Sequence, residues 1–147
     1  MPDYFGKDVF KLGFGLMRLP KNPDGGIDIA QTSEMVDRFL AAGGTYFDTA
    51  YVYGGSEEAT KKALVDRHPR ESYTLCTKLN AGIPNLDEDG AKRQLYTSLE
   101  RTGAGYFDFY LLHAIQSGNR TKYDGFHLWD FVEEQKAKGV LKHIGFS

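Results

Sequence analysis

The stretch YFDFYLLH, residues 106–113, is an almost unbroken apolar run that ends in a histidine. Apolar residues at consecutive positions are typical of a strand in a parallel sheet that is covered on both faces. The run lies between two helical patterns, 85–103 and 126–139, and the first of these begins with acidic residues and ends at Gly103. The stretch therefore predicts one unit of a repeating strand–helix fold.

The same alternation extends in both directions along the chain. Strands are predicted at 11–20, 45–50, 72–79, 106–113 and 140–147, and helices at 32–44, 55–68, 85–103 and 126–139. Such alternation builds right-handed parallel βαβ units. A small hairpin is predicted at 3–10, before the first strand, and no linker or low-complexity segment divides the 147 residues. The pattern predicts one α/β domain.

The helix predicted at 55–68 has a recognisable start. Ser56 is expected to be its N-cap, and Glu57 and Glu58 are expected to lie at the positive end of the helix dipole.

Two architectures fit the alternation: an open doubly wound sheet and part of a (β/α)₈ barrel. A doubly wound nucleotide-binding domain usually has a glycine-rich turn that leads from its first strand into a helix. The segment GFGLMRLP, residues 13–20, has two glycines, but arginine and proline follow them instead of a helix start. The barrel is favoured because polar residues end successive strands, where barrel active sites lie.

The composition excludes several classes of protein. Lys plus Arg number 18 against 20 Asp plus Glu, for a net charge of −2. Nucleic-acid-binding proteins usually have an excess of basic residues, so this class is disfavoured. The chain has no apolar run long enough for a membrane span and no signal-peptide pattern at its start. Its one cysteine, Cys76, is expected to be a small buried residue in a protein of a reducing compartment, the cytoplasm.

Four polar residues are expected at one end of the predicted barrel. Asp48 ends the second strand, Lys78 the third and His113 the fourth, and Tyr53 lies in the loop after the second. A phenol has a pKa of about 10, and a nearby ammonium group lowers it. A carboxylate can hold that ammonium in place, and an imidazole can orient a carbonyl group. The set predicts a general acid that protonates a carbonyl oxygen.

Each of these residues also has an ordinary structural role open to it. Asp48 could cap a loop, Tyr53 could be a packing residue, Lys78 could lie at the surface, and His113 could be an interior histidine with satisfied hydrogen bonds. A metal site is disfavoured because one aspartate and one histidine are too few ligands for a closed zinc site. The shared location of all four residues favours the catalytic interpretation.

The sequence resembles the aldo-keto reductase family. FDTAYVYGGSEEATKKAL, residues 47–64, resembles the family's strand-two motif, and SLERTGAGYFDFYLLH, residues 98–113, resembles its motif of helix three and strand four. TKL at 77–79, GVLKHIGFS at 139–147 and LGFGLMRLP at 12–20 are similar to three further segments in the family's order. The segment GLMRLP, residues 15–20, is most similar to that of bacterial members that carry a C-terminal iron–sulfur domain.

The resemblance implies a (β/α)₈ barrel that uses NADPH, or less often NADH, to reduce an aldehyde or ketone. It implies Tyr53 as the acid, Lys78 and Asp48 as its partners, and His113 as the group that orients the carbonyl. It also implies that Met17, Asp48 and Ser147 lie near the nicotinamide end of the cofactor.

A complete barrel of this type takes about 250 residues or more, so the 147 residues are expected to form only the first five strands and four helices. The family's residues that stack on the nicotinamide and bind the adenosine phosphate belong to the later strands. The chain is therefore expected to be a partial barrel, a fragment that is inactive by itself or that pairs through its open edges as a homodimer.

Three functional readings stay open from the sequence. The first is a reductase, or the N-terminal part of one. The second is a non-catalytic half-barrel that serves as an interaction module. The third is a different barrel enzyme, an isomerase or lyase, which would turn over its substrate without a nicotinamide cofactor.

Overall fold

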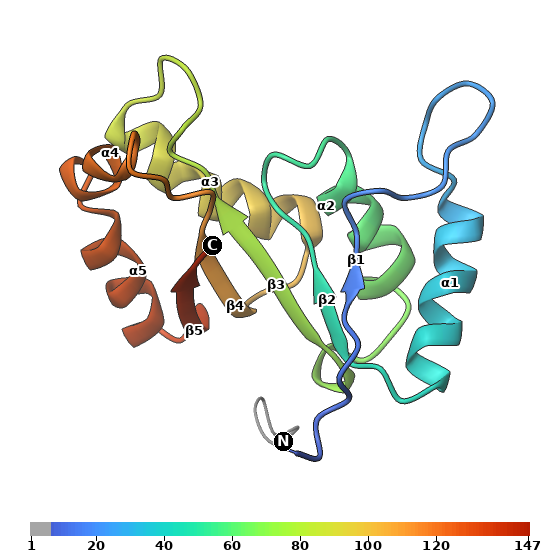
Figure 1. The fold of residues 1–147 in the computed structure, drawn as a ribbon. Helices are drawn as coiled ribbons and strands as arrows, with labels where there is room; N and C mark the ends of the chain where they lie inside the picture. The colour runs from blue at the N-terminus through green and yellow to red at the C-terminus, as the bar shows by residue number, and fades with distance from the viewer. Residues whose placement is uncertain (1–6) are drawn as a thin grey trace.

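The computed structural model describes residues 7–147, which form a five-stranded parallel sheet in the order β1-β2-β3-β4-β5 (Figure 1). The strands are β1 Phe14–Gly15, β2 Tyr46–Asp48, β3 Thr74–Leu79, β4 Phe107–Leu112 and β5 Leu141–Phe146. The helices are α1 Ile29–Ala41, α2 Ser56–Thr60, α3 Glu88–Thr102, α4 Arg120–Gly125 and α5 Leu128–Ala137. Every strand pairs with its neighbours in the sequence, which confirms the predicted parallel α/β arrangement.

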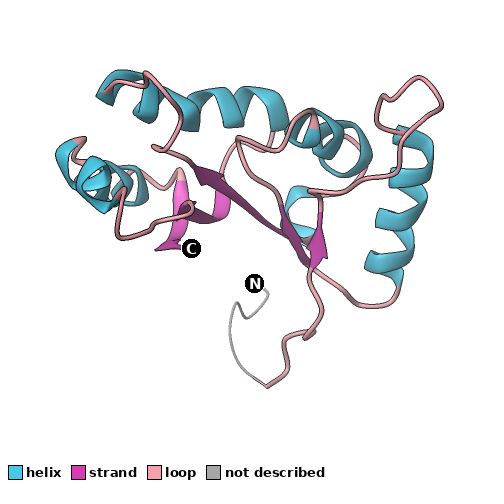
Figure 2. Cartoon of the chain, turned by 45° about the horizontal axis from the view of Figure 1, so that its top comes forward, coloured by secondary structure: helices cyan, strands magenta, loops and turns pink. Residues whose placement is uncertain are grey.

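The helices form an arc along one face of the sheet, and among residues 7–147 no helix lies on the other face (Figure 2). The helix-facing side of the sheet carries the core, which includes the fully buried Phe47, Leu75 and Leu112. Aromatic rings line the opposite face of the sheet, which the described helices leave uncovered (Figure 2). The ring of Phe109 lies 5.4 Å from that of Tyr46 and stacks at 5.1 Å on that of His143. None of the helices in residues 7–147 has the length and apolar character that a membrane span requires.

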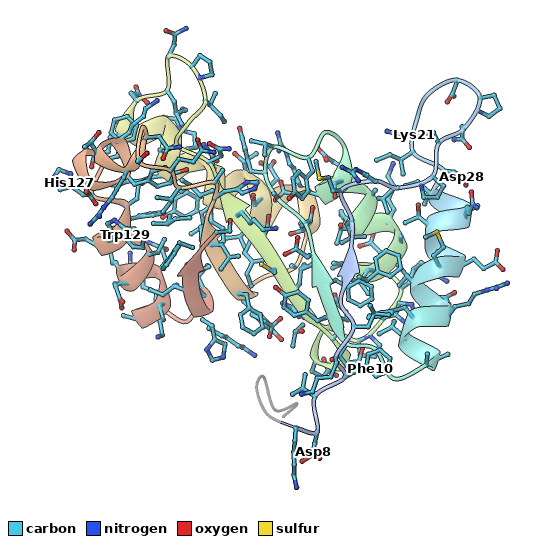
Figure 3. The ribbon with its side chains drawn as sticks, in the orientation of Figure 1. Asp8, Phe10, Lys21, Asp28, His127 and Trp129 are labelled. Carbon is cyan, nitrogen blue, oxygen red and sulfur yellow. The ribbon has the colours of Figure 1, made fainter. Side chains whose placement is uncertain are left out.

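Helix α1 begins three residues earlier than predicted, because the cap that starts it is Asp28. The Asp28 carboxylate accepts a hydrogen bond from the backbone N–H of Gln31 at 2.9 Å, which satisfies one of the free N–H groups of the first turn. The preceding loop is closed by a bridge between Lys21 and Ile27, and Figure 3 shows Lys21 and Asp28 on its two sides. Asp28 thus lies four residues before the predicted start at Thr32.

Helix α2 differs from its prediction in its cap. The N-cap is Gly55, whose φ of +74° is the left-handed conformation that glycine adopts most easily. Ser56 is the first helical residue, and the prediction that it caps the helix is wrong. The helix continues into a π-helical turn, η1, over Lys61–Val65.

Two short helical elements were not predicted: the 3₁₀ turn η2, Arg70–Ser72, and α4. Most of the hairpin predicted at 3–10 lies outside the described residues, and 7–10 contain no strand.

Cys76 lies in the middle of β3, with no exposed surface. Burial raises the pKa of its thiol to about 12, so almost no reactive thiolate is present near neutral pH. We expect a thiol reagent to leave the native protein unlabelled at mildly alkaline pH and to label one thiol per chain once a denaturant unfolds it. Rapid stoichiometric labelling of the native protein would contradict the position of β3 inside the sheet.

Candidate active site

Asp48 and Lys78 form an ion pair at the carboxyl ends of neighbouring strands. Lys78 Nζ lies 2.6 Å from Asp48 Oδ1 and donates a second hydrogen bond, of 2.7 Å, to the carbonyl oxygen of Thr49. The Lys78 side chain is 6% exposed, whereas that of Asp48 is 30% exposed. An ammonium group with so little contact with water is held in one place by its two acceptors. The structure thus brings these two predicted residues into direct contact.

Tyr53 lies next to this pair, in the loop between β2 and α2. Lys78 Nζ lies 5.3 Å from the centroid of the Tyr53 ring, and the ring of His113 contacts it edge to face at 5.8 Å. The Tyr53 backbone is held by two turns, because its N–H donates to the carbonyl of Ala50 and its carbonyl accepts from Ser56. All four residues predicted to be catalytic therefore gather at one end of the sheet.

His113 directly follows β4, and its backbone is held in two ways. Its N–H donates to the carbonyl of Leu79 at 2.8 Å, and its carbonyl accepts a hydrogen bond from the hydroxyl of Tyr123 in α4. The Tyr123 hydroxyl also accepts from the backbone N–H of Ala81 at 3.1 Å, so one side chain ties the ends of β3 and β4 together. Sequence reasoning missed Tyr123, because nothing in RTKYDG, residues 120–125, predicts a helix.

The surroundings of His113 favour the neutral form of its imidazole. Burial, followed by the positive charge of Lys78, lowers the pKa of His113 from its ordinary value of 6.5, although the charge of Asp48 acts in the opposite direction. Within residues 7–147 its Nδ1 is buried without a hydrogen-bond partner. A neutral imidazole has one N–H to donate, which suits a group that orients a carbonyl oxygen.

This lowered pKa gives the folded protein a pH dependence. Below the ordinary value of 6.5 the unfolded chain binds a proton at His113 that the folded chain resists. The stabilising effect of neutral His113 is therefore complete above that value and is lost as the pH falls from it through the lowered pKa of the folded protein, by at most about 1.4 kcal/mol per pH unit. We expect His113→Gln to flatten the fall of the free energy of unfolding on acidification. Urea titrations of both proteins at several pH values measure this slope, and an unchanged slope in His113→Gln would contradict the burial of a neutral imidazole at this position.

The two other predicted site residues flank the four. Met17 follows β1 and is 58% exposed. Ser147 follows β5, donates its N–H to the carbonyl of Leu112 at 3.0 Å and accepts from the N–H of Ile115 at 2.8 Å, which places it beside the end of β4. The part of Met17 and Ser147 in a cofactor site stays a prediction.

A buried polar network under the Tyr53 loop was also missed. Ser56 Oγ donates to the carbonyl of Leu16 at 2.8 Å and shares a 2.7 Å hydrogen bond with the hydroxyl of Thr49. The hydroxyl that was predicted to cap a helix thus joins the ends of β1 and β2. Glu57 lies in the first turn of α2, as predicted, and is completely buried.

Comparisons with known proteins identify the family of the chain. The sequence profile described as the Aldo/keto reductase family matches residues 11–147. The chain belongs to the aldo/keto reductase family. The resemblance seen in the motifs is thereby confirmed.

Relatives and solved structures show how much of the family's fold this aldo/keto reductase chain contains. It is 30% identical over 146 residues to aldo-keto reductase str7 of Strobilurus tenacellus. This alignment covers 95% of the chain and 42% of that protein. It is 32% identical over 117 residues to the NAD/NADP-dependent indole-3-acetaldehyde reductase of Schizosaccharomyces pombe, covering 78% of the chain and 38% of that protein.

Among solved structures, the holo form of aldo-keto reductase AKR11C1 from Bacillus halodurans is 29% identical with a TM-score of 0.73. That match covers 95% of this chain and 46% of the solved chain. A putative aldo-keto reductase from Pseudomonas aeruginosa is 20% identical with a TM-score of 0.79, which shows the shared fold. The chain thus spans less than half the length of the curated relatives named here.

Proposed function

We propose that the protein acts in the NAD(P)H-dependent reduction of an aldehyde or ketone to an alcohol, with Tyr53 as the acid. The observation that carries this proposal is the 2.6 Å Lys78–Asp48 ion pair, whose lysine is almost completely buried, with the Tyr53 ring 5.3 Å from the ammonium group. A structural ion pair at a strand end would not need a phenol and an imidazole beside it. Family membership and the name of the reductase from S. pombe support the same chemistry.

The geometry supports the following roles for the four residues. The Tyr53 hydroxyl donates its proton to the carbonyl oxygen of the substrate, and the Lys78 ammonium stabilises the phenolate that remains. Asp48 holds that ammonium in position through its 2.6 Å contact. The neutral His113 imidazole donates a hydrogen bond to the same carbonyl oxygen and orients it.

The residues present fit the nicotinamide end of the cofactor. Met17 offers an exposed apolar surface beside the site, and Ser147 offers a hydroxyl able to bind a carboxamide. We propose that these two residues and Asp48 hold this end of NADPH, or of NADH. When bound, the nucleotide supplies the hydride for the carbonyl carbon. The reductase from S. pombe is named as both NAD- and NADP-dependent, so the choice between the two is left to experiment.

We also propose that residues 1–147 are one structural unit, the part of a (β/α)₈ barrel that carries the catalytic residues. Strands β1 and β5 lie at the two ends of the described sheet, and Phe146 at the β5 edge is 70% exposed. Open parallel edges favour pairing with another chain. Edge-to-edge pairing of two copies would cover both edges, and a stable monomer by light scattering would contradict it. The single buried thiol suits a reducing compartment such as the cytoplasm.

The half-barrel interaction module is the second candidate, and the same open edges favour it. An assay of NADPH consumption with small aldehydes, in the presence and absence of the purified chain, separates the two functions. Turnover that requires the nucleotide supports the reductase. Turnover without a nicotinamide nucleotide would instead indicate an isomerase or lyase, and association without turnover would indicate the interaction module.

A further inference from the structure

Glu57 is a buried carboxylate to which the proposed reaction gives no role. The residue has no exposed surface, although it lies in the first turn of α2, only four positions after Tyr53. Its Oε1 accepts a 2.7 Å hydrogen bond from the hydroxyl of Thr77, the residue that precedes Lys78 in β3. Burying a carboxylate completely costs free energy unless the carboxylate is paired. The partners of Glu57 therefore need to be identified.

Its ionic partner is Arg101 of α3, 44 residues along the chain, and α2 packs against α3 (Figure 1). Arg101 Nη1 lies 3.3 Å from Glu57 Oε2 and donates a 3.2 Å hydrogen bond to the carbonyl oxygen of Tyr51. The guanidinium carbon also lies 4.6 Å from the centroid of the Tyr51 ring. One cation therefore joins the buried carboxylate to the backbone of the loop that carries Tyr53.

The opposite side of the same peptide segment is held by the sheet. The N–H of Tyr51 donates to the carbonyl of Lys78 at 3.2 Å. The Tyr51 segment is thus held on one side by the backbone of Lys78 in β3. On the other side it is held by Arg101, which is paired with Glu57. Tyr53 is two residues further along, in a turn closed on Ala50.

We propose that Glu57 and Arg101 are positioning residues that set the distance between the Tyr53 hydroxyl and the Lys78 ammonium. This inference rests on the proposed reductase function for its kinetic consequence. The arrangement of Glu57, Thr77 and Arg101, here called the Glu57 clamp, works through the Tyr51 carbonyl and touches no reacting atom. Displacement of a reacting group by about 1 Å can lower the rate by about 100-fold, which gives the clamp its importance.

Arginine suits this role because its guanidinium group makes contacts from two of its nitrogens. Nη1 serves both Glu57 and the Tyr51 carbonyl, while Nε lies 3.4 Å from Glu58 Oε1, and lysine has only one nitrogen for all three. Arg101→Lys should therefore keep the charge beside Glu57 and keep the fold, but release the loop. A merely structural ion pair would be restored by lysine.

The test uses four variants of the whole chain: Arg101→Lys, Arg101→Met, the double variant Arg101→Met with Glu57→Gln, and Arg67→Met. The double variant removes the unpaired buried charge that could unfold Arg101→Met alone. Arg67→Met is the matched control, because Arg67 also forms an ion pair, with Asp37 at 2.6 Å, and its side chain is 36% exposed against 32% for Arg101. That pair joins α1 to the end of η1 and does not contact the Tyr53 loop.

Two readouts are compared in these variants. One is the ¹⁹F spectrum of protein labelled with 3-fluorotyrosine, in which the Tyr53 signal is assigned by its loss in Tyr53→Phe. The other is kcat and KM for NADPH-dependent aldehyde reduction. We expect a shifted or broadened Tyr53 signal in every Arg101 variant, a kcat lower by up to about 100-fold and an unchanged KM for the nucleotide. Arg67→Met should match the wild type in both readouts.

An unchanged Tyr53 signal in the folded Arg101→Lys and double variants would overturn the proposal, as would full recovery of kcat by lysine. The spectrum does not depend on turnover. If the wild type shows no reductase activity, the proposed function fails, while the ¹⁹F comparison still decides whether the Glu57 clamp positions Tyr53.

Discussion

Tyr53→Phe is expected to lower kcat for NADPH-dependent aldehyde reduction by about 10²- to 10⁴-fold, the usual contribution of a positioned general acid. The substitution removes one oxygen and keeps the ring that contacts His113 and lies over the Lys78 ammonium. The stability of the fold and the affinity for the nucleotide should therefore be retained. Steady-state kinetics and nucleotide titration of the same preparation measure the two effects separately.

The matched control is Tyr96→Phe, which removes a phenol oxygen from a side chain on α3 that is 51% exposed. Its kcat should equal that of the wild type. If Tyr53→Phe keeps full activity, another group protonates the substrate and the proposed role of Tyr53 is wrong. If both variants lose activity equally, the loss does not come from the site.

Asp108→Asn is expected to destabilise the fold by about 3–5 kcal/mol, the typical effect of removing one partner of a buried ion pair. Asp108 lies in β4 and is 2% exposed. Its Oδ2 accepts hydrogen bonds from Arg70 Nη2 at 2.8 Å and from the N–H of Leu75 at 2.9 Å. Lys142 Nζ lies 3.7 Å from its Oδ1, so charges from two further segments meet at this carboxylate.

Arg70 shows why the loss should be large. Its guanidinium group donates to the carbonyls of Ala104, Tyr73 and Tyr106 and lies 3.9 Å from the centroid of the Tyr106 ring. With Asp108 neutral, this cation would remain fixed in a side chain that is only 16% exposed, without its ionic partner. Since a domain is typically stable by only about 5–15 kcal/mol, the change should be plain in a urea titration followed by circular dichroism.

The exposed pair of Arg38 and Glu34 provides the comparison. Its side chains are 79% and 62% exposed, and Glu34→Gln should change the free energy of unfolding by less than about 1 kcal/mol. Equal effects of Asp108→Asn and Glu34→Gln would show that the network around Asp108 does not hold the strands together.

The sequence was sufficient for those features that depend on local pattern. The apolar run at 106–113 predicted β4 to within a residue at each end, and parallel strands place their carboxyl ends at one edge, so Asp48, Lys78 and His113 could be located together. The first strand was predicted too long. Only Phe14 and Gly15 pair with β2, because the chain leaves the sheet soon after Gly15.

The features that were missed depend on partners far apart in the sequence. Glu57 looks like an ordinary acid of a first helical turn, and its burial follows from Thr77 and Arg101, which only the fold brings to it. The role of Tyr123 depends in the same way on the ends of β3 and β4. No periodicity within a window of the sequence can indicate such contacts.

Titration of the purified 147-residue chain with NADPH, with nucleotide fluorescence and particle mass recorded together, tests most directly whether the residues gathered here serve a nicotinamide reductase. Saturable binding in the micromolar range is the predicted result, with the mass showing whether one copy or two form the site. No binding up to millimolar nucleotide would contradict the proposal that this chain holds the cofactor beside Tyr53.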